Sequence, residues 1–462
     1  MGVFARLKEI PFVAKLRQHP TGFWFVFMGE LAERASYYGM RTLLALYLVD
    51  VVGFEQNKGA TVVHLFMAFC YLLPLLGGFI ADRYLGRYKT IVYFSIPYIA
   101  GHFLLGATHT PLWIYFALGL LAMGSGTIKP STSPLMGMIY EKAGKSDLLP
   151  EAFSIFYLSI NIGSLFSTYI LPSVRESFKP ATGWTEASRS LGYQVALAFP
   201  TVLMIVALGI FALGKRYYPA EKVTERPQKT PEQARAETAT LLRLAGVFTL
   251  IIFWWFIYDQ NADIWVYFAR DHMNLQLWPF TKTITPDQIQ AVNPFFIIAF
   301  TPFFNWQWNA IKARRGGRAV PATQKMLLGF LLTAVTALIM MGAAMVASTG
   351  VMVSVWWQIL AFAMLTYAEL CISMVGLEFA YEQALPGTKS TVTAVFFLTI
   401  FVGDLLGAAV VHYYEHPLSP TNYFAIQLAA MVACSILFWF VAKRFERNAE
   451  GPRAPVNAAA AA

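Results

Sequence analysis

Four charged side chains and two tyrosines share one face of an apolar segment near the start of the sequence, which reads Glu30-Leu-Ala-Glu33-Arg34-Ala-Ser-Tyr37-Tyr38-Gly-Met-Arg41. At 100° per residue in an α-helix, these side chains cover an arc of about 140°. An ionisable group at membrane depth costs at least about 2.5 kcal/mol, so the stripe must face a water-filled cavity or charged partners rather than lipid. A cavity with both signs of charge suits a zwitterionic solute, whose carboxylate binds the cations and whose ammonium binds the acids.

Apolar segments farther along the chain hold more ionisable residues, namely Lys129, Asp259, Asp263, Glu369, Glu378 and Asp404. Internal ion pairs that only fasten helices together would explain one such pair. The number of charges exceeds what fastening requires and favours a transport path. Aromatic side chains such as Tyr71 and Trp255 would give this path apolar walls with polar tips.

Carboxylates in such a cavity also suggest proton movement, because a carboxylate whose cation is taken over by the substrate can bind a proton near neutral pH. His64 lies in the middle of the apolar run Thr61-Val-Val-His64-Leu-Phe. It has two interpretations, which the residues alone leave open. It is either a hydrogen-bonded packing residue or, beside the charged stripe, a proton acceptor.

The composition identifies the elements that must position these residues. Hydrophobic residues make up 57% of the 462 residues and charged residues 13%, against about 25% charged in an ordinary soluble domain. Twelve apolar runs are long enough to cross a bilayer; they cover about 22–50, 59–81, 89–109, 111–140, 151–173, 190–214, 240–268, 290–310, 322–347, 353–378, 388–413 and 421–443. The sequence therefore predicts an all-α membrane protein with twelve transmembrane helices.

One long polar interruption, rich in proline and charge, divides the chain into two sets of six helices. We predict a six-helix bundle at 22–214, a cytoplasmic linker at 215–239 and a second six-helix bundle at 240–443. With both termini inside, 26 of the 35 Lys and Arg residues lie in cytoplasmic segments and six in external loops. The segments 1–21 and 444–462 are accordingly expected to be cytoplasmic, with no cleaved leader.

Enzyme chemistry finds little support in the sequence. The three cysteines, Cys70, Cys371 and Cys434, all lie in apolar runs without metal-ligand spacing. There is no His/Asp cluster and no Gly-x-Ser-x-Gly elbow, and nothing implies a metal or cofactor. The net charge is +9, but the charged residues lie between apolar runs rather than on a soluble basic face. Nucleic acid is therefore not an expected partner.

Two short motifs fit a transporter. The loop Gly77-Gly78-Phe-Ile-Ala-Asp82-Arg83-Tyr-Leu-Gly86-Arg87 permits close helix packing and can form a cytoplasmic charge latch between Asp82 and Arg87. The segment Gly124-Ser-Gly126-Thr-Ile-Lys129-Pro130 combines small residues, a buried cation and a proline that can bend the helix.

In these residues the chain resembles the proton-coupled oligopeptide transporter family of the major facilitator superfamily. The motifs that carry the resemblance run in the family's order, namely Glu30-x-x-Glu33-Arg34 with Ser36 to Gly39, Gly78 to Arg87, Lys129-Pro130, Phe156 to Leu165, Trp255 to Gln260, Asn293-Pro294 and Glu369 to Gly376. The resemblance implies the major facilitator fold, alternating access and uptake of di- and tripeptides with protons across the bacterial inner membrane. The polar linker is too short to hold the two extra helices found in many bacterial members.

The resemblance also implies roles for individual residues. Arg34, Lys129 and Asn161 would bind the peptide carboxylate, Asn293 and Glu369 its amino end, and Tyr38, Tyr71 and Trp255 would line the pocket. Glu30, Glu33, His64 and Asp259 would take part in proton coupling. Arg41 would pair with Asp259 at the outer gate and Lys129 with Glu369 nearer the inner gate, with Asp82 and Arg87 as the cytoplasmic latch. A functional monomer is expected on the resemblance alone.

Several positions depart from the family's pattern, among them Ala35, Met374, Glu378 and Asp404, and they leave the peptide preference open. Two alternatives also remain. The same fold could carry another small organic solute or anion, although Glu30 and Glu33 argue against a purely anionic one. A peptide sensor that binds its ligand without moving it would have the same charged stripe.

Overall fold

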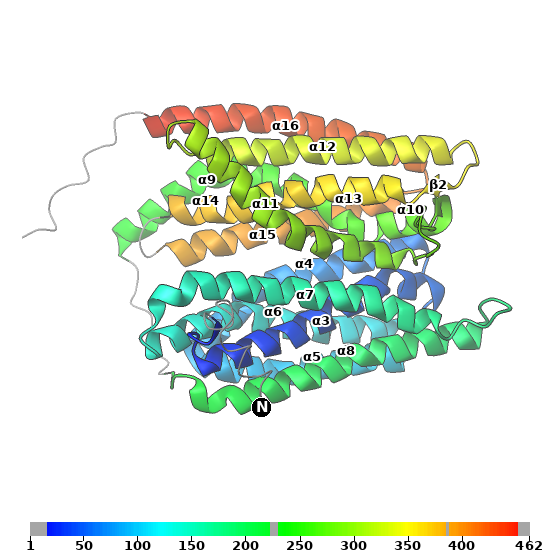
Figure 1. Ribbon diagram of the computed structural model, residues 1–462, viewed down its shortest axis with the longest axis horizontal. Helices are drawn as coiled ribbons and strands as arrows, with labels where there is room; N and C mark the ends of the chain where they lie inside the picture. Colours follow the sequence, from blue (N-terminus) through cyan, green and yellow to red (C-terminus); the bar gives the residue numbers. More distant parts are fainter. Residues whose placement is uncertain (1–15, 222–229, 385–387, 451–462) are drawn as a thin grey trace, which may run out of the picture. The chain divides into compact units, whose positions relative to one another are not determined.

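The computed structural model describes residues 16–221, 230–384 and 388–450. Parts of the predicted segments 1–21, 215–239 and 444–462 therefore lie outside the described residues. The described chain is almost entirely helical (Figure 1). Its strands are two residues long, β1 (Met273–Asn274) and β2 (Val353–Ser354).

Twelve long helical segments fill the described residues, as predicted. The first six are α3 (Thr21–Asp50), α4 (Gln56–Ile80), α5 (Arg87–Ala107), α6 (Pro111–Lys142), α7 (Leu149–Glu176) and α8 (Glu186–Gly214). The other six are α9 (Pro231–Tyr258), α11 (Val292–Arg314), α12 (Ala322–Ala347), α13 (Trp356–Glu369) continued through a π-helical turn into α14 (Val375–Gln383), α15 (Lys389–Val410) and α16 (Pro420–Glu450). Short elements join them, notably α10 (Ile264–His272), the π-helical turn η1 (Ala81–Leu85) and the 3₁₀ turns η4 (Asp259–Ala262) and η5 (Asp287–Ala291).

Ten of these segments are apolar enough over their length to cross a membrane, and α3 and α11 are not among them. The reason in α3 is its charge, because Glu30, Glu33, Arg34 and Arg41 occupy its middle. All four lie at a depth where lipid contact would be costly, so the helix depends on its neighbours to cover them. The chain is a multi-pass membrane protein.

The seventh predicted helix is broken in the structure. The sequence predicts one helix over 240–268, whereas α9 ends at Tyr258 and α10 starts at Ile264, after the 3₁₀ turn η4. The side chain of Asp263 accepts a hydrogen bond from the Ile264 backbone N–H at 2.6 Å and so caps a new helix. At its other end, α9 begins at Pro231, inside the predicted linker, because proline suits the first turn of a helix.

By the contacts between Cα atoms, the chain forms two compact units. Among the described residues, unit 1 comprises 16–221, 260–298 and 407–412, and unit 2 comprises 230–259, 299–384, 388–406 and 413–450. These units are a different division of the chain from the two predicted six-helix halves, whose bounds stay a prediction.

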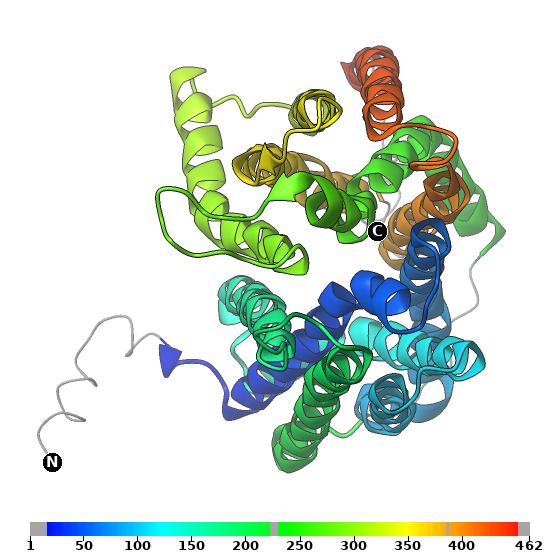
Figure 2. The ribbon, with the colours of Figure 1, turned by 90° about the vertical axis from the view of Figure 1, so that its right-hand side faces the viewer.

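Within unit 1, α3 packs closely against α7 and α8 (Figures 1 and 2). A Cβ atom on Gly163 of α7 would lie 2.6 Å from the Leu31 carbonyl oxygen of α3, and one on Gly39 of α3 would lie 2.5 Å from a Leu171 methyl. Only glycine permits this approach of two helix backbones. The close packing encloses the charged middle of α3. Within unit 2, α12 packs against α13 and α16.

Candidate functional site

The charged residues of α3 form one buried ion cluster. The Arg34 guanidinium donates from Nη2 to Glu33 Oε1 at 2.6 Å and from Nε to Glu33 Oε2, while its Nε lies 3.3 Å from Glu30 Oε1. Arg34 and Glu30 are each 4% exposed and Glu33 is fully buried. Glu33 thus holds Arg34 through a two-pronged contact, whereas Glu30 has the weaker single contact.

A second cation lies beside this cluster. Lys129 Nζ of α6 lies 4.5 Å from the ring centroid of Tyr37 and 4.9 Å from that of Tyr71. Arg34 lies 5.3 Å from the same Tyr37 ring. A cation over an aromatic face is stabilised by the ring quadrupole without being neutralised, so it remains able to bind an anion.

Three other residues of unit 1 were singled out from the sequence, namely Tyr38 and Arg41 of α3 and Asn161 of α7. Tyr38 is half-buried and its ring contacts that of Tyr37, with centroids 5.2 Å apart. Asn161 of α7 is 5% exposed and donates to the Tyr157 carbonyl of its own helix at 2.9 Å. Arg41, half-buried one turn farther along α3, directs its Nε to Met67 Sδ at 3.2 Å.

His64 forms an ion pair with Asp263. His64 Nε2 of α4 lies 3.2 Å from Asp263 Oδ2, and both side chains are fully buried. The sequence singled out Asp259 for proton coupling and named Asp263 only among the buried charges. Asp259 itself lies in the 3₁₀ turn η4 and is 6% exposed.

The predicted residues of unit 2 gather around an aromatic group on α9. Trp255 is buried, and its ring centroid lies 4.7 Å from that of Trp254 and 5.4 Å from that of Tyr258. The Tyr258 hydroxyl donates to Glu369 Oε2 at 2.7 Å. Glu369 is the last residue of α13 and directly precedes the π-helical turn Leu370–Met374. Because such turns are rare and concentrate at functional sites, the turn marks Glu369 independently of its charge.

Asn293 is half-buried near the start of α11 and belongs to unit 1. The expected pairs Arg41–Asp259 and Lys129–Glu369 would each join a residue of unit 1 to one of unit 2. Both pairs stay predictions.

The contact predicted between Asp82 and Arg87 includes a residue that the sequence did not single out. Arg87 Nη2 lies 3.1 Å from Asp82 Oδ1, as predicted, and its Nη1 lies 3.2 Å from Glu221 Oε2. The Glu221 carboxylate also accepts backbone N–H bonds from Arg87 at 2.8 and 2.9 Å and from Tyr88 at 3.3 Å. A carboxylate at the N-terminus of α5 satisfies unpaired N–H groups and complements the helix dipole.

The sequence reasoning named Asp263 only as a buried charge, without a role, and did not single out Tyr258 or Glu221. Asp263 precedes an apolar helical pattern, which is the signal of an N-cap. Tyr258 stands within the Trp255 to Gln260 motif and could have been found there. Glu221 lies in the proline- and charge-rich linker, where no local pattern distinguishes it.

Among the described residues, no group of three His, Cys, Asp or Glu side chains is placed to hold a metal ion. The described residues of unit 1 supply ion pairs, aromatic faces and carboxylates, which can bind a charged solute and take up protons.

The chain is similar to known proteins in both sequence and structure. The family model described as "POT family" matches residues 88–231 and 221–426. The chain belongs to this family. It is 31% identical over 332 residues to human "Solute carrier family 15 member 2", covering 62% of this chain and 44% of that protein, and 32% identical over 371 residues to "Peptide transporter 3" of Caenorhabditis elegans, covering 71% and 51%. The chain thus spans about half the length of these curated relatives.

A bacterial relative and a solved structure match over nearly their whole length. The "Uncharacterized transporter YclF" of Bacillus subtilis is 25% identical, covering 91% of this chain and 93% of that protein. The crystal structure of the POT family transporter PepTSo superposes with a TM-score of 0.80 at 26% identity and covers 93% of this chain and 99% of that one. The twelve-helix fold is therefore that of the POT transporters.

Proposed function

We propose that the chain imports di- and tripeptides together with protons by alternating access, with its two six-helix halves moving about a central site. The observation that carries the proposal is the buried ion cluster of α3, in which Arg34 is shared by Glu30 and Glu33 beside Lys129. Family membership and the names of the relatives support it. In this proposal no cofactor is needed, the chain is not an enzyme, and the proton gradient supplies the free energy.

The charges of the cluster supply the coupling. A peptide carboxylate bound by Arg34 and Lys129 brings a further negative charge next to Glu30 and Glu33, in a site shielded from water. Protonation of a glutamate removes the resulting repulsion. Glu30 is the glutamate that gives up its contact with Arg34 most readily because it has only one, whereas Glu33 keeps the guanidinium oriented.

The other predicted residues keep their proposed roles. Tyr38, Tyr71, Asn161 and Trp255 shape the pocket, and Asn293 and Glu369 bind the peptide's amino end. His64 with Asp263 and Asp259 takes part in proton transfer, while Arg41, Asp82 and Arg87 act in gating. The protein is proposed to be a monomer of the bacterial inner membrane with both termini cytoplasmic.

Uptake of labelled dialanine into proteoliposomes tests the function. With an inward proton gradient at matched membrane potential, we expect accumulation that unlabelled dipeptide competes away. Saturable dialanine binding without accumulation would favour the sensor. Neither binding nor uptake of dialanine, with gradient-driven uptake of another solute, would favour the alternative cargo.

A further inference from the structure

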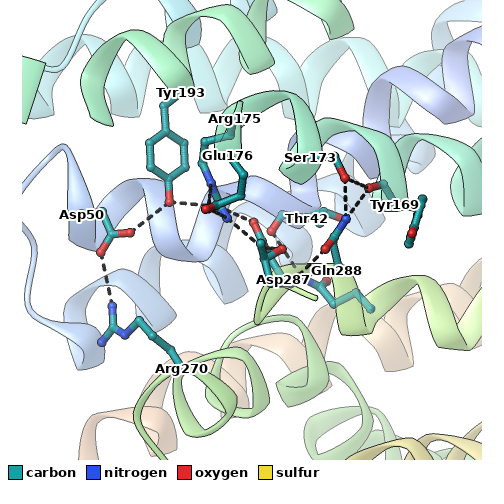
Figure 3. A network of polar contacts seen from close by, with 12 residues as sticks. Thr42, Asp50, Tyr169, Ser173, Arg175, Glu176, Tyr193, Arg270, Asp287 and Gln288 are labelled. Atoms are coloured by element: carbon teal, nitrogen blue, oxygen red, sulfur yellow. Dashed lines mark hydrogen bonds and ion pairs between the residues drawn. The ribbon is translucent and has the colours of Figure 1, made fainter. Parts of the chain in front are cut away.

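A polar network outside the proposed peptide site joins the end of α7 to the turn η5 (Figure 3). Arg175 Nη1 lies 2.5 Å from Asp287 Oδ2, and its Nη2 lies 3.1 Å from Asp287 Oδ1. Arg175 is 3% exposed and Asp287 is fully buried. This two-pronged geometry is the strongest form of an Arg–carboxylate contact.

The network continues to three more helices. Arg175 Nη1 also donates to the Tyr193 hydroxyl of α8 at 3.2 Å, and that hydroxyl donates to Asp50 Oδ2 at the end of α3 at 3.1 Å. Asp50 Oδ1 lies 3.4 Å from Arg270 Nη1 of α10. Two points of the segment 260–298, Arg270 and Asp287, are therefore held by the ends of α3 and α7, and Tyr193 of α8 links those two ends.

Neutral contacts fasten the same turn. Gln288 Nε2 donates to the Tyr169 carbonyl at 2.8 Å and lies 2.7 Å from Ser173 Oγ, both on α7. Gln290 Nε2 donates to the Thr42 carbonyl of α3 at 3.3 Å. These side chains satisfy backbone carbonyls of α3 and α7 as long as the turn stays in place.

A buried ion pair is a weak source of net stability, because desolvation of the two charges offsets their attraction. Loss of one partner, in contrast, strands the other charge. A buried ion pair therefore suits a segment that has two discrete positions. In one position the two charges are paired, and in the other both charges are hydrated. Arg175 Nη2 also lies 2.9 Å from Glu176 Oε1. Asp50, Arg175, Glu176 and Arg270 lie at or near helix ends, Asp287 starts η5, and these positions adjoin predicted external loops, which water reaches when the contact opens.

We propose that Arg175 and Asp287, with Tyr193, Asp50 and Arg270, form an outer latch. Closed, the latch holds the segment 260–298 against α3 and α7. Open, it releases this segment so that the external entrance can widen. The proposal rests on the proposed alternating-access function and adds a second external contact, separate from Arg41 and Asp259.

Spin labels at two exposed positions measure the latch directly. Ser177 follows α7, and Thr281 precedes η5. In a background with the three buried cysteines replaced by alanine, double electron–electron resonance between labels at these sites reports how far the segment lies from α7. Labels at Ser177 and the exposed Leu112 provide a reference distance within the first six helices.

We expect Arg175→Gln and Asp287→Asn each to raise the ratio of long to short Ser177–Thr281 distances at least about fivefold, in line with ordinary conformational couplings. The double variant should raise the ratio no further than the larger single effect, because one pair is broken in all three. The Ser177–Leu112 distance should not change. Lys179→Gln, which removes an exposed charge four residues from Arg175, is the matched control and should leave both distances unchanged.

An unchanged Ser177–Thr281 distribution in folded Arg175→Gln and Asp287→Asn would overturn the latch. If either variant fails to fold, Arg175→Lys and Tyr193→Phe provide milder breaks, and an unchanged distribution in both would overturn it equally. Dialanine uptake by the parent protein is measured in the same preparation. Lengthened distances without uptake in the parent would leave the latch standing and reject peptide transport.

Discussion

The imidazole Nε2 of His64 lies 3.2 Å from Oδ2 of Asp263, with both side chains fully buried. Asp263 also caps α10, so one carboxylate fixes the start of a helix and faces a titratable ring on α4. This arrangement places the negative charge of Asp263 against the ring as an ion pair. The break between α9 and α10 is therefore part of the proposed proton site rather than an irregularity of the helix.

Substitution of Asp263 tests this assignment. Asp263→Asn keeps an oxygen that can cap α10 but removes the charge that faces His64. We expect gradient-driven dialanine uptake to fall at least about tenfold, since a lost charge-assisted contact is worth about 1.5–3 kcal/mol, while dialanine counterflow, which needs no net proton movement, falls less than threefold. Asp147→Asn, at an exposed position, is the control and should behave like the parent protein. Equal losses in both assays would assign Asp263 to structure instead.

Some features of this molecule follow from local sequence patterns and can be predicted, whereas others depend on residues that are far apart in the sequence. Hydropathy sets the helices, and the run predicted at 322–347 coincides with α12 because no charged residue interrupts it after Lys325. The break at Asp263 was missed although the polar run Asp259-Gln-Asn-Ala-Asp263 precedes α10, because the apolar residues on both sides of that run fit one continuous helix. The predicted helix at 151–173 ends before Arg175, yet Arg175 is buried near the end of α7. Its burial depends on Asp287, 112 residues away, and no local pattern reveals such a partner.

Arg34 should be indispensable for peptide binding. Arg34→Ala leaves Glu30 and Glu33 buried without their cation, and breaking a buried pair costs about 3–5 kcal/mol. We expect uptake to fall at least about 100-fold, and Arg34→Lys to recover only part of it because a lysine cannot make the two-pronged contact with Glu33. Lys312→Gln is the control. Normal uptake by a folded Arg34→Ala protein would refute the binding assignment.

The ring of Tyr71 should matter more than its hydroxyl. Lys129 Nζ lies 4.9 Å from the ring centroid, and a cation–π contact is worth about 1–2 kcal/mol when partly desolvated. Tyr71→Phe keeps the ring, so the KM for dialanine should stay within about threefold of the parent value. Tyr71→Leu removes the ring and should raise KM about 5- to 30-fold. If Tyr71→Phe and Tyr71→Leu have the same KM, the contact between Lys129 and the Tyr71 ring does not contribute to dialanine binding.

Glu221 should stabilise the start of α5. Glu221→Gln removes the charge that faces Arg87 and two backbone N–H groups. Caps and dipole contacts of this kind contribute about 1 kcal/mol, so the melting temperature should fall by roughly 2 °C. Glu232→Gln, at an exposed position of α9, should melt with the parent protein. An unchanged melting temperature for Glu221→Gln would show that the linker does not hold α5.

His109, in the loop between α5 and α6, gives a pH dependence with a defined sign. Burial lowers the pKa of His109 below its ordinary value of 6.5, and its Nε2 lies 3.0 Å from the Gln194 amide nitrogen, which donates to a neutral ring. As the pH falls, His109 therefore binds a proton at a higher pH in the unfolded chain than in the folded chain. Stability is complete above about pH 6.5 and declines as the pH falls below that value. The melting temperature should drop from pH 7 to pH 5.5, and His109→Gln should reduce that drop.

The central claim is that one buried ion cluster both binds the peptide and takes up the proton. Glu30→Gln separates the two roles, because it removes a proton acceptor and leaves the contact between Arg34 and Glu33 intact. In proteoliposomes, we expect this variant to keep dialanine counterflow within about threefold of the parent protein and to lose accumulation driven by a proton gradient. Gradient-driven accumulation at the parent rate would contradict the claim.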